Sequence, residues 1–248
     1  MKLQKKVLKL SLSLSLFILF SIISCTSLPE NKTEVSEKTS FDYKTIKIDE
    51  KLDYLTTKIE YPEFYSFPEL NKRIKNTVEN EWKSFRSYSQ ASWNEINSLN
   101  NSENGNKYPP FEFNTSFQVS SSGNIISVLI NNYIFSGGAH GNTTLITLNY
   151  DSQNSRYLDI RDVSGMSYNQ LSEICLQKLT KVLIDDNKDI TTPSEIMDMK
   201  EMINSGAFPQ AGNFEIFTIK NKSLTVYFEP YSVAPYVYGI QTVIIPLK

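Results

Sequence analysis

His140 is the only histidine among the 248 residues, and it lies in the segment Ser136-Gly137-Gly138-Ala139-His140-Gly141. A serine near a histidine could form part of a Ser-His-Asp triad, in which the histidine takes the proton of the serine. Ser136 does not lie in the sharp turn from strand to helix that exposes a nucleophilic serine. The favoured interpretation is that the imidazole covers the edge of the sheet or bonds a backbone carbonyl, while Gly137 and Gly138 permit a left-handed or bulged turn. We therefore expect no catalysis, with a hydrolase that uses His140 as the alternative.

Metal-binding side chains are scattered along the chain. A zinc site needs three or four Cys, His or carboxylate ligands, and no such spacing is present. A calcium loop needs acidic residues around a glycine, and the acidic residues of the polar segment lack one: Asp185, Asp186, Asp189, Glu195 and Asp198. Cys175 lies on an apolar helix face and is expected in the core. We expect no metal and no cofactor.

Aromatic side chains gather near the C-terminus, with Tyr227, Phe228, Tyr231, Tyr236 and Tyr238 inside twelve residues. The rings either pack on a sheet or form an exposed surface that recognises a ligand, because tyrosine offers a large contact area at a low entropy cost. Both interpretations can hold together. The candidate ligand-binding residues are Gly137, Gly138, His140, Tyr231, Tyr236 and Tyr238.

Cys25 follows a segment typical of export. Residues 1–24 contain four lysines, then an apolar run, and end in Ile22-Ile23-Ser24 before the cysteine. This ending resembles a bacterial lipobox, in which the cysteine is lipidated, by palmitate among other acyl chains, and becomes the new N-terminus. An ordinary secretory signal is the alternative, whereas serines interrupt the apolar run and disfavour a retained transmembrane helix. We expect a lipid-anchored protein on the extracytoplasmic side of the cell envelope.

The net charge of the mature chain limits the classes of partner that it can attract. Removal of residues 1–24 leaves 21 of the 25 basic residues and all 27 acidic residues, which gives a formal charge of −6. Nucleic acid and anionic lipid headgroups are disfavoured as partners by this charge, whereas a basic protein is not. Cys175 is the only cysteine besides Cys25, so no intrachain disulfide is expected once Cys25 is lipidated.

The elements that must position these residues follow from hydrophobic periodicity. Residues 25–40 are polar and predict a tether. Apolar residues at helical spacing from Leu70 onward predict a helix that runs to about residue 88, or further through Trp93 and Ile96, and Ser66, Pro68 and Glu69 supply its N-terminal cap. Ser167 and Gln170 form a capping box that starts a second helix, with an apolar face of Leu171, Ile174, Cys175, Leu179, Val182 and Leu183. A short helix is expected at 194–203. Strands are predicted at 43–48, 55–61, 111–119, 125–135, 143–150, 157–160, 214–220, 223–228 and 242–247.

This order of elements predicts an α+β fold with two modules, each a helix packed on an antiparallel sheet. The N-terminal module is assigned to residues 41–155 and the C-terminal module to residues 156–248.

Two segments resemble known families. The segment 136–141, with the strand that ends in Asn149-Tyr150, is similar to a domain of bacterial envelope proteins that also precedes the catalytic domain of PdaC-type peptidoglycan deacetylases. Residues 226–239, which begin Val-Tyr-Phe-Glu-Pro-Tyr, and residues 243–247 resemble the extracellular C-terminal domain of RsiV-type anti-sigma factors. The function of both domains is unknown in general.

The RsiV resemblance implies an outward-facing domain whose ligand is lysozyme. Anti-sigma and deacetylase activities are not expected, because no sigma-binding, signal-transducing or deacetylase segment is recognised. The main hypothesis is therefore a non-catalytic lipoprotein that binds a lysozyme-like protein or peptidoglycan. The alternatives are an envelope hydrolase that uses His140 and a structural scaffold lipoprotein.

Overall fold

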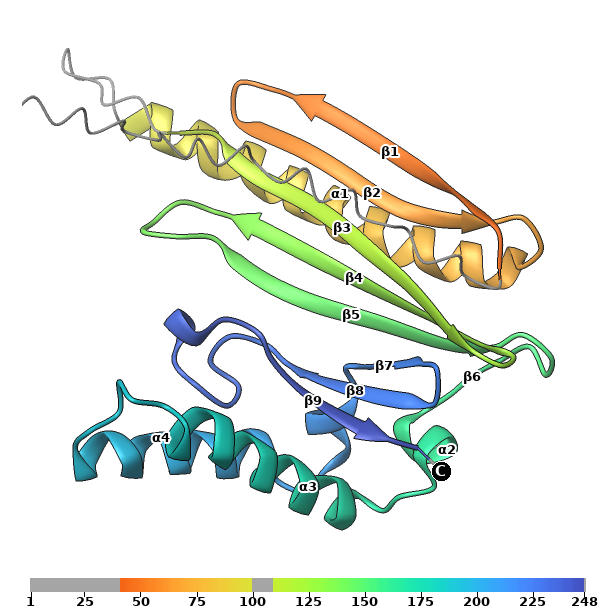
Figure 1. Ribbon diagram of the computed structural model, residues 1–248. Coiled ribbons are helices and arrows are strands. Elements are labelled where there is room, and N and C mark those ends of the chain that lie inside the picture. The colour runs from red at the N-terminus through yellow and green to blue at the C-terminus, as the bar shows by residue number, and fades with distance from the viewer. Residues whose placement is uncertain (1–40, 100–108, 248) are drawn as a thin grey trace, which may run out of the picture. The chain divides into compact units, whose positions relative to one another are not determined.

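The structure, a computed structural model, describes residues 41–99 and 109–247 (Figure 1). The predicted signal segment 1–24, the lipidated Cys25 and the tether 25–40 lie outside these residues, so their assignments remain predictions. In the described part of the chain, the helices are too short or too polar to cross a membrane.

The N-terminal part is a six-stranded sheet with the strand order β1-β2-β3-β4-β5-β6. Short turns join β3 to β4 and β4 to β5, so these long neighbours pair as hairpins, as their apolar patterns predict. The strands are β1 (Tyr43–Lys51), β2 (Leu55–Phe64), β3 (Phe111–Ser122), β4 (Ile125–Phe135), β5 (Asn142–Asp151) and β6 (Arg156–Tyr157).

One pairing in this sheet differs from the predicted antiparallel arrangement. β2 and β3 run parallel over a short register, Leu55–Lys58 beside Phe111–Asn114. The chain between them contains the long helix α1 (Pro68–Leu99), and a crossover through a helix brings the next strand back in the same direction. The α+β class is thus confirmed, with a mixed first sheet.

Helix α1 lies along one face of the six-stranded sheet (Figure 1). Leu70, Ile74 and Val78 recur at four-residue spacing and are buried against the sheet. Asn71 links the first turns of the helix to the end of β2, because its side chain accepts from the Phe64 N–H at 2.8 Å and donates to the Phe64 carbonyl at 2.7 Å. The helix ends at Leu99, so the longer of the two predictions, through Trp93 and Ile96, is confirmed and the end near residue 88 is too early.

The C-terminal part packs helices on a three-stranded antiparallel sheet, in the order β7-β8-β9. Its core contains the predicted helix residues Leu171, Cys175, Leu179 and Leu183. The elements are α2 (Ile160–Ser164), α3 (Tyr168–Thr180), the π-helical turn η1 (Lys181–Asp185), α4 (Pro193–Gly206), the 3-10 turn η2 (Ala211–Phe214), β7 (Phe217–Lys220), β8 (Ser223–Phe228), the 3-10 turn η3 (Tyr236–Tyr238) and β9 (Gln241–Pro246).

Local signals locate the helix starts here. Ser167 and Gln170 form the predicted capping box of α3, and Thr192 and Glu195 form another at α4. The expectation for Val182 was wrong, because this side chain is 59% exposed. The α-helix changes to a π-helical turn at Lys181, which moves Val182 off the predicted face, whereas Leu183 stays buried in the core.

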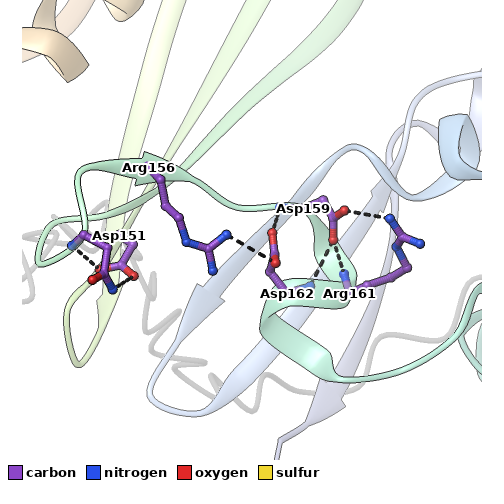
Figure 2. A network of polar contacts seen from close by, with 6 residues as sticks. Asp151, Arg156, Asp159, Arg161 and Asp162 are labelled. Carbon is purple, nitrogen blue, oxygen red and sulfur yellow. Dashed lines mark hydrogen bonds and ion pairs between the residues drawn. The ribbon is translucent and has the colours of Figure 1, made fainter.

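Polar contacts join β6 to the start of α2 (Figure 2). Asp159 accepts from the N–H groups of Arg161 and Asp162, so Ile160 begins a helix and does not end the predicted strand 157–160. Arg156 donates to the Asp162 carboxylate at 3.3 Å. Donated hydrogen bonds, foremost from the Asp162 N–H, lower the pKa of Asp159.

Side chains of the large sheet complete the hydrogen bonding of β7, the edge strand of the small sheet. The N–H groups of Phe217 and Ile219 donate to hydroxyl oxygens at 3.2 and 3.0 Å. The carbonyl groups of the same two residues accept hydrogen bonds, each at 2.9 Å. A neighbouring strand would ordinarily supply these bonds. Here four side chains take its place: Ser120, Ser127, Thr147 and Asn149.

Candidate functional site

The turn between β4 and β5 carries the predicted residues Gly137, Gly138 and His140. Gly137 and Gly138 have φ angles of 91° and 93°, in the region that favours glycine, so they shape the backbone as predicted. Gly141 has a different role, because a Cβ atom at this position would overlap the ring of Tyr133. The turn is therefore seated directly against β4.

The Tyr-rich loop between β8 and β9 carries Tyr231 and Tyr236. Tyr231 has a φ angle of 71°, which is uncommon for a side chain of this size. Two backbone bonds hold this conformation: the Tyr231 N–H donates to the Ala234 carbonyl at 3.1 Å, and the Ser232 N–H donates to the Glu229 carbonyl at 3.0 Å. The Tyr231 side chain is left 57% exposed.

The turn and the loop meet in space, although about 90 residues of chain separate them. The rings of His140 and Tyr236 stack with their centroids 4.0 Å apart, and the Tyr231 ring lies 5.6 Å from that of Tyr236. The carbonyl oxygen of Gly141 accepts from the Tyr236 hydroxyl at 3.0 Å and from His140 Nδ1 at 2.9 Å. We call His140, Tyr231 and Tyr236 the aromatic cluster.

The hydrogen bonds of the cluster define its chemistry. A carbonyl oxygen only accepts, so His140 Nδ1 carries a proton and Nε2 is left to interact with a ligand. The imidazole is oriented by a carbonyl and a stacked ring, whereas a triad histidine is oriented by a carboxylate. In the described chain, no hydrogen bond joins His140 to Ser136 or to an acidic side chain. The arrangement suits contact with a ligand more than proton transfer.

Tyr238 does not join the aromatic cluster. Its hydroxyl accepts from Asn187 Nδ2 at 3.1 Å, and its ring packs against the C-terminal core. Gly137 and Gly138 contribute only backbone. Of the six candidate residues, the structure thus brings the side chains of His140, Tyr231 and Tyr236 together.

Two residues that the sequence did not single out support the cluster. Glu229 accepts from the Leu145 N–H of β5 at 2.5 Å and so fastens the Tyr-rich loop to the large sheet. Tyr133 supports the turn through its contact with Gly141. The partner of Glu229 is a backbone group far away in the sequence, so no local pattern indicates this contact. The only sequence signal for Glu229 was its place inside the segment that resembles RsiV.

The other reactive groups lie elsewhere. Cys175 is buried in the C-terminal core, and desolvation raises the pKa of its thiol to about 12. Lys181 pairs with Asp186 at 2.9 Å, while Glu195 caps α4. Among residues 41–99 and 109–247, no three side chains of the Cys, His, Asp and Glu types gather as a metal ion would require.

Two family models match the chain. The family described as "Deacetylase PdaC" matches residues 48–143, and the family described as "Protein of unknown function (DUF3298)" matches residues 164–248. His140 belongs to the first match, and Tyr231 and Tyr236 belong to the second. The aromatic cluster therefore contains side chains from both matched segments.

One similar protein is the peptidoglycan-N-acetylmuramic acid deacetylase PdaC of Bacillus subtilis. It is 32% identical over 123 residues, which are 48% of this chain and 24% of that protein. The matched region thus spans about a quarter of the length of this relative.

Two solved structures share the fold. A DUF3298 family member from Bacteroides fragilis has a TM-score of 0.58 and 20% identity, with 84% of this chain and 91% of that chain covered. A DUF3298 family protein from Pseudomonas aeruginosa has a TM-score of 0.55 and 16% identity, with 85% and 92% covered. The chain contains a PdaC-type domain followed by a DUF3298 domain, as its motifs predict.

Proposed function

We propose that this protein is a non-catalytic binding module, held on the outer side of a membrane by lipid on Cys25, that recognises a ligand of the cell envelope. A lysozyme-like protein is the most specific candidate ligand, with peptidoglycan as the other. The aromatic cluster is the observation that carries the proposal, because it places two tyrosines and the only histidine of the chain on one surface.

Several features support ligand contact at this cluster. Tyr231 is exposed and is held in a backbone conformation that costs roughly 1–3 kcal/mol, and such conformations concentrate at binding sites. Val237 lies in the same loop and is 85% exposed. Tyrosines with an apolar body and a polar tip are frequent in the energetically dominant part of protein interfaces.

Net charge supports a basic protein as the ligand. The mature chain has a formal charge of −6, whereas lysozymes of the common animal type are basic. Opposite net charges accelerate encounter between two proteins, and salt weakens this effect. Binding by this module should therefore weaken as the ionic strength rises.

The test is titration of the mature chain with c-type lysozyme by calorimetry at low and physiological salt. We expect micromolar or tighter binding, and we expect Tyr231→Ala to weaken it at least tenfold, which corresponds to about 1.4 kcal/mol. Tyr65→Ala is the matched control, because Tyr65 is an exposed tyrosine that follows β2 and lies outside the cluster. Equal affinity of the two variants would contradict the assignment of the cluster.

Peptidoglycan and catalysis are tested in parallel. Sedimentation of the chain with purified cell wall would favour peptidoglycan as the ligand if lysozyme does not bind. An activity on cell-wall material that disappears in His140→Ala would contradict the non-catalytic assignment. The anchor is tested by metabolic labelling with a fatty acid, which Cys25→Ser should abolish.

A further inference from the structure

A pocket of about 460 Å³ lies on the large sheet and has no part in the aromatic cluster. It forms beside the end of the short parallel register of β2 and β3, after which the two strands diverge (Figure 1). Its size falls within the range of small-molecule sites, roughly 300–1,000 Å³. The pocket is lined by Lys47, Asp49, Lys58, Ile59, Glu60, Asn114, Thr115, Ser116, Asn131, Tyr133 and Thr143.

Strand register explains why so many polar side chains line one pocket. Lys47 lies opposite Glu60, Asn114 lies opposite Tyr133, and Ser116 lies opposite Asn131. Directly paired residues project to the same face of a sheet. The helix α1 covers the other face, so these side chains gather on the face that α1 leaves open.

The charges in the pocket balance. Two lysines and two acidic residues line it, and Lys47 Nζ lies 2.5 Å from a carboxylate oxygen of Glu60. A balanced pocket gives no net attraction to a polyanion or a polycation. It does supply both hydrogen-bond donors and hydrogen-bond acceptors, which suits an uncharged ligand rich in hydroxyl or amide groups.

Backbone groups at the divergence of β2 and β3 are already occupied. The hydroxyl oxygen of Thr115 accepts from the Glu60 N–H and donates to the Glu60 carbonyl, each at 3.0 Å. Pro62, two residues further along β2, has no N–H group. An extended peptide that binds a sheet pairs with free backbone groups. The pocket is therefore better suited to a ligand that is bound through side-chain contacts than to an extended peptide.

Two amides at the pocket wall have unmet hydrogen-bonding capacity. The side-chain oxygens of Asn114 and Asn131 are buried and have no hydrogen-bond partner. An unpaired buried acceptor costs about 1–3 kcal/mol, and rotation of the amide toward a ligand hydroxyl would remove this cost. Tyr133 adds a ring whose apolar face can contact the C–H groups of a sugar ring.

We propose that this pocket binds a short segment of an uncharged oligosaccharide. Balanced charge, side-chain amides and hydroxyls, one aromatic ring and occupied backbone groups together favour this class over a peptide or a charged polymer. The site is separate from the aromatic cluster and does not require lysozyme as a partner. The same chain would then carry two binding surfaces of different chemistry.

The experiment uses the full lipidated chain in a detergent without a sugar headgroup, titrated by calorimetry. The probes are the tetramer of N-acetylglucosamine, the tetramer of glucose and the anionic tetramer of galacturonic acid. We expect saturable binding of at least one neutral tetramer with a Kd of about 1 mM or tighter. The anionic tetramer should bind at least tenfold more weakly.

Two variants assign the binding to the pocket. Ser116 is exposed, so Ser116→Trp fills the pocket without disturbing the core and should abolish binding. Lys58→Ala removes an exposed donor and should weaken binding severalfold. Tyr231→Ala should leave sugar binding unchanged even though it weakens binding at the aromatic cluster. Loss of lysozyme binding with retained sugar binding, or the reverse, therefore distinguishes failure of one proposal from failure of the other.

Three results would overturn the oligosaccharide proposal. These are the absence of saturable binding by both neutral tetramers, binding that Ser116→Trp leaves intact, and tighter binding of the galacturonic acid tetramer. A neutral tetrapeptide that binds more tightly than either sugar would also overturn it and would assign the pocket to peptides.

Discussion

The aromatic cluster and the β2–β3 pocket are built in opposite ways. The cluster joins two loops from different domains, and it is held by hydrogen bonds from the side chains of His140 and Tyr236 to one backbone carbonyl, that of Gly141. The pocket lies within one domain, and the register of neighbouring strands places its side chains. A site between domains depends on their docking, whereas a site within a sheet depends only on that sheet. Substitutions where the two domains pack together should therefore weaken binding at the aromatic cluster and leave binding in the pocket intact.

The largest effect is expected from a substitution at Asn149, where the large sheet bonds β7 of the small sheet. Asn149 is buried, bonds the Phe217 carbonyl and accepts from Ser127 at 2.5 Å, so Asn149→Leu leaves buried polar groups unpaired. We expect the free energy of unfolding to fall by roughly 3 kcal/mol, as measured by urea denaturation. Binding at the aromatic cluster should be lost, and sugar binding in the pocket should survive.

Asn204→Leu is the control for this prediction, because Asn204 is exposed on α4. It should change the stability by less than about 0.5 kcal/mol. If Asn149→Leu weakened both binding activities equally while the chain stayed folded, the two sites would not be independent.

A smaller effect is expected at the point where the two sites approach each other. A methyl group at Gly141 overlaps the ring of Tyr133, which lines the pocket, while the Gly141 carbonyl holds the cluster. Gly141→Ala should lower stability by about 1–3 kcal/mol and weaken binding at both sites. Gly212→Ala meets no atom within 4 Å and should be nearly neutral. Thermal unfolding of the two variants checks this difference, and equal melting temperatures would refute it.

The smallest effect is on the segment that links the domains. The pKa of Asp159 is lowered in the folded state, so its contribution to stability is present above the unfolded pKa, near 4, and is lost as the pH falls through the folded value. Asp159 is largely exposed, so solvent screening limits this contribution to less than about 1 kcal/mol. Asp159→Asn should flatten the stability curve below pH 4 and leave binding at both sites unchanged. If urea denaturation gave the same dependence of the unfolding free energy on pH below pH 4 for Asp159→Asn and for the unchanged protein, this role would be contradicted.

Local sequence signals predicted much of the fold. The spacing of Leu70, Ile74 and Val78 predicted α1, and Ser167 with Gln170 predicted the start of α3. These signals work because caps and apolar faces involve residues within a few positions of one another. The parallel pairing of β2 with β3 was missed because the direction of a strand depends on the path of the chain between strands.

The candidate site was predictable in part for the same reason. His140, Tyr231 and Tyr236 belong to compact motifs, and the structure brings them together. Tyr238 has the same residue type and the same local setting, but its hydroxyl bonds Asn187 in the C-terminal core, which no local pattern reveals. The pocket gave no signal, because its lining comes from five strands whose relative register is a tertiary property.

The side-chain bonds along β7 also bear on self-association. An open strand edge is where copies of a sheet protein join and aggregate. With Ser120, Ser127, Thr147 and Asn149 bonded to it, β7 offers no backbone groups of Phe217 or Ile219 to a second chain. At the opposite edge, Lys178 donates to the Ile244 carbonyl of β9 at 3.0 Å and adds a charge there. Many copies can therefore crowd together with little risk that their small sheets fuse into a continuous one.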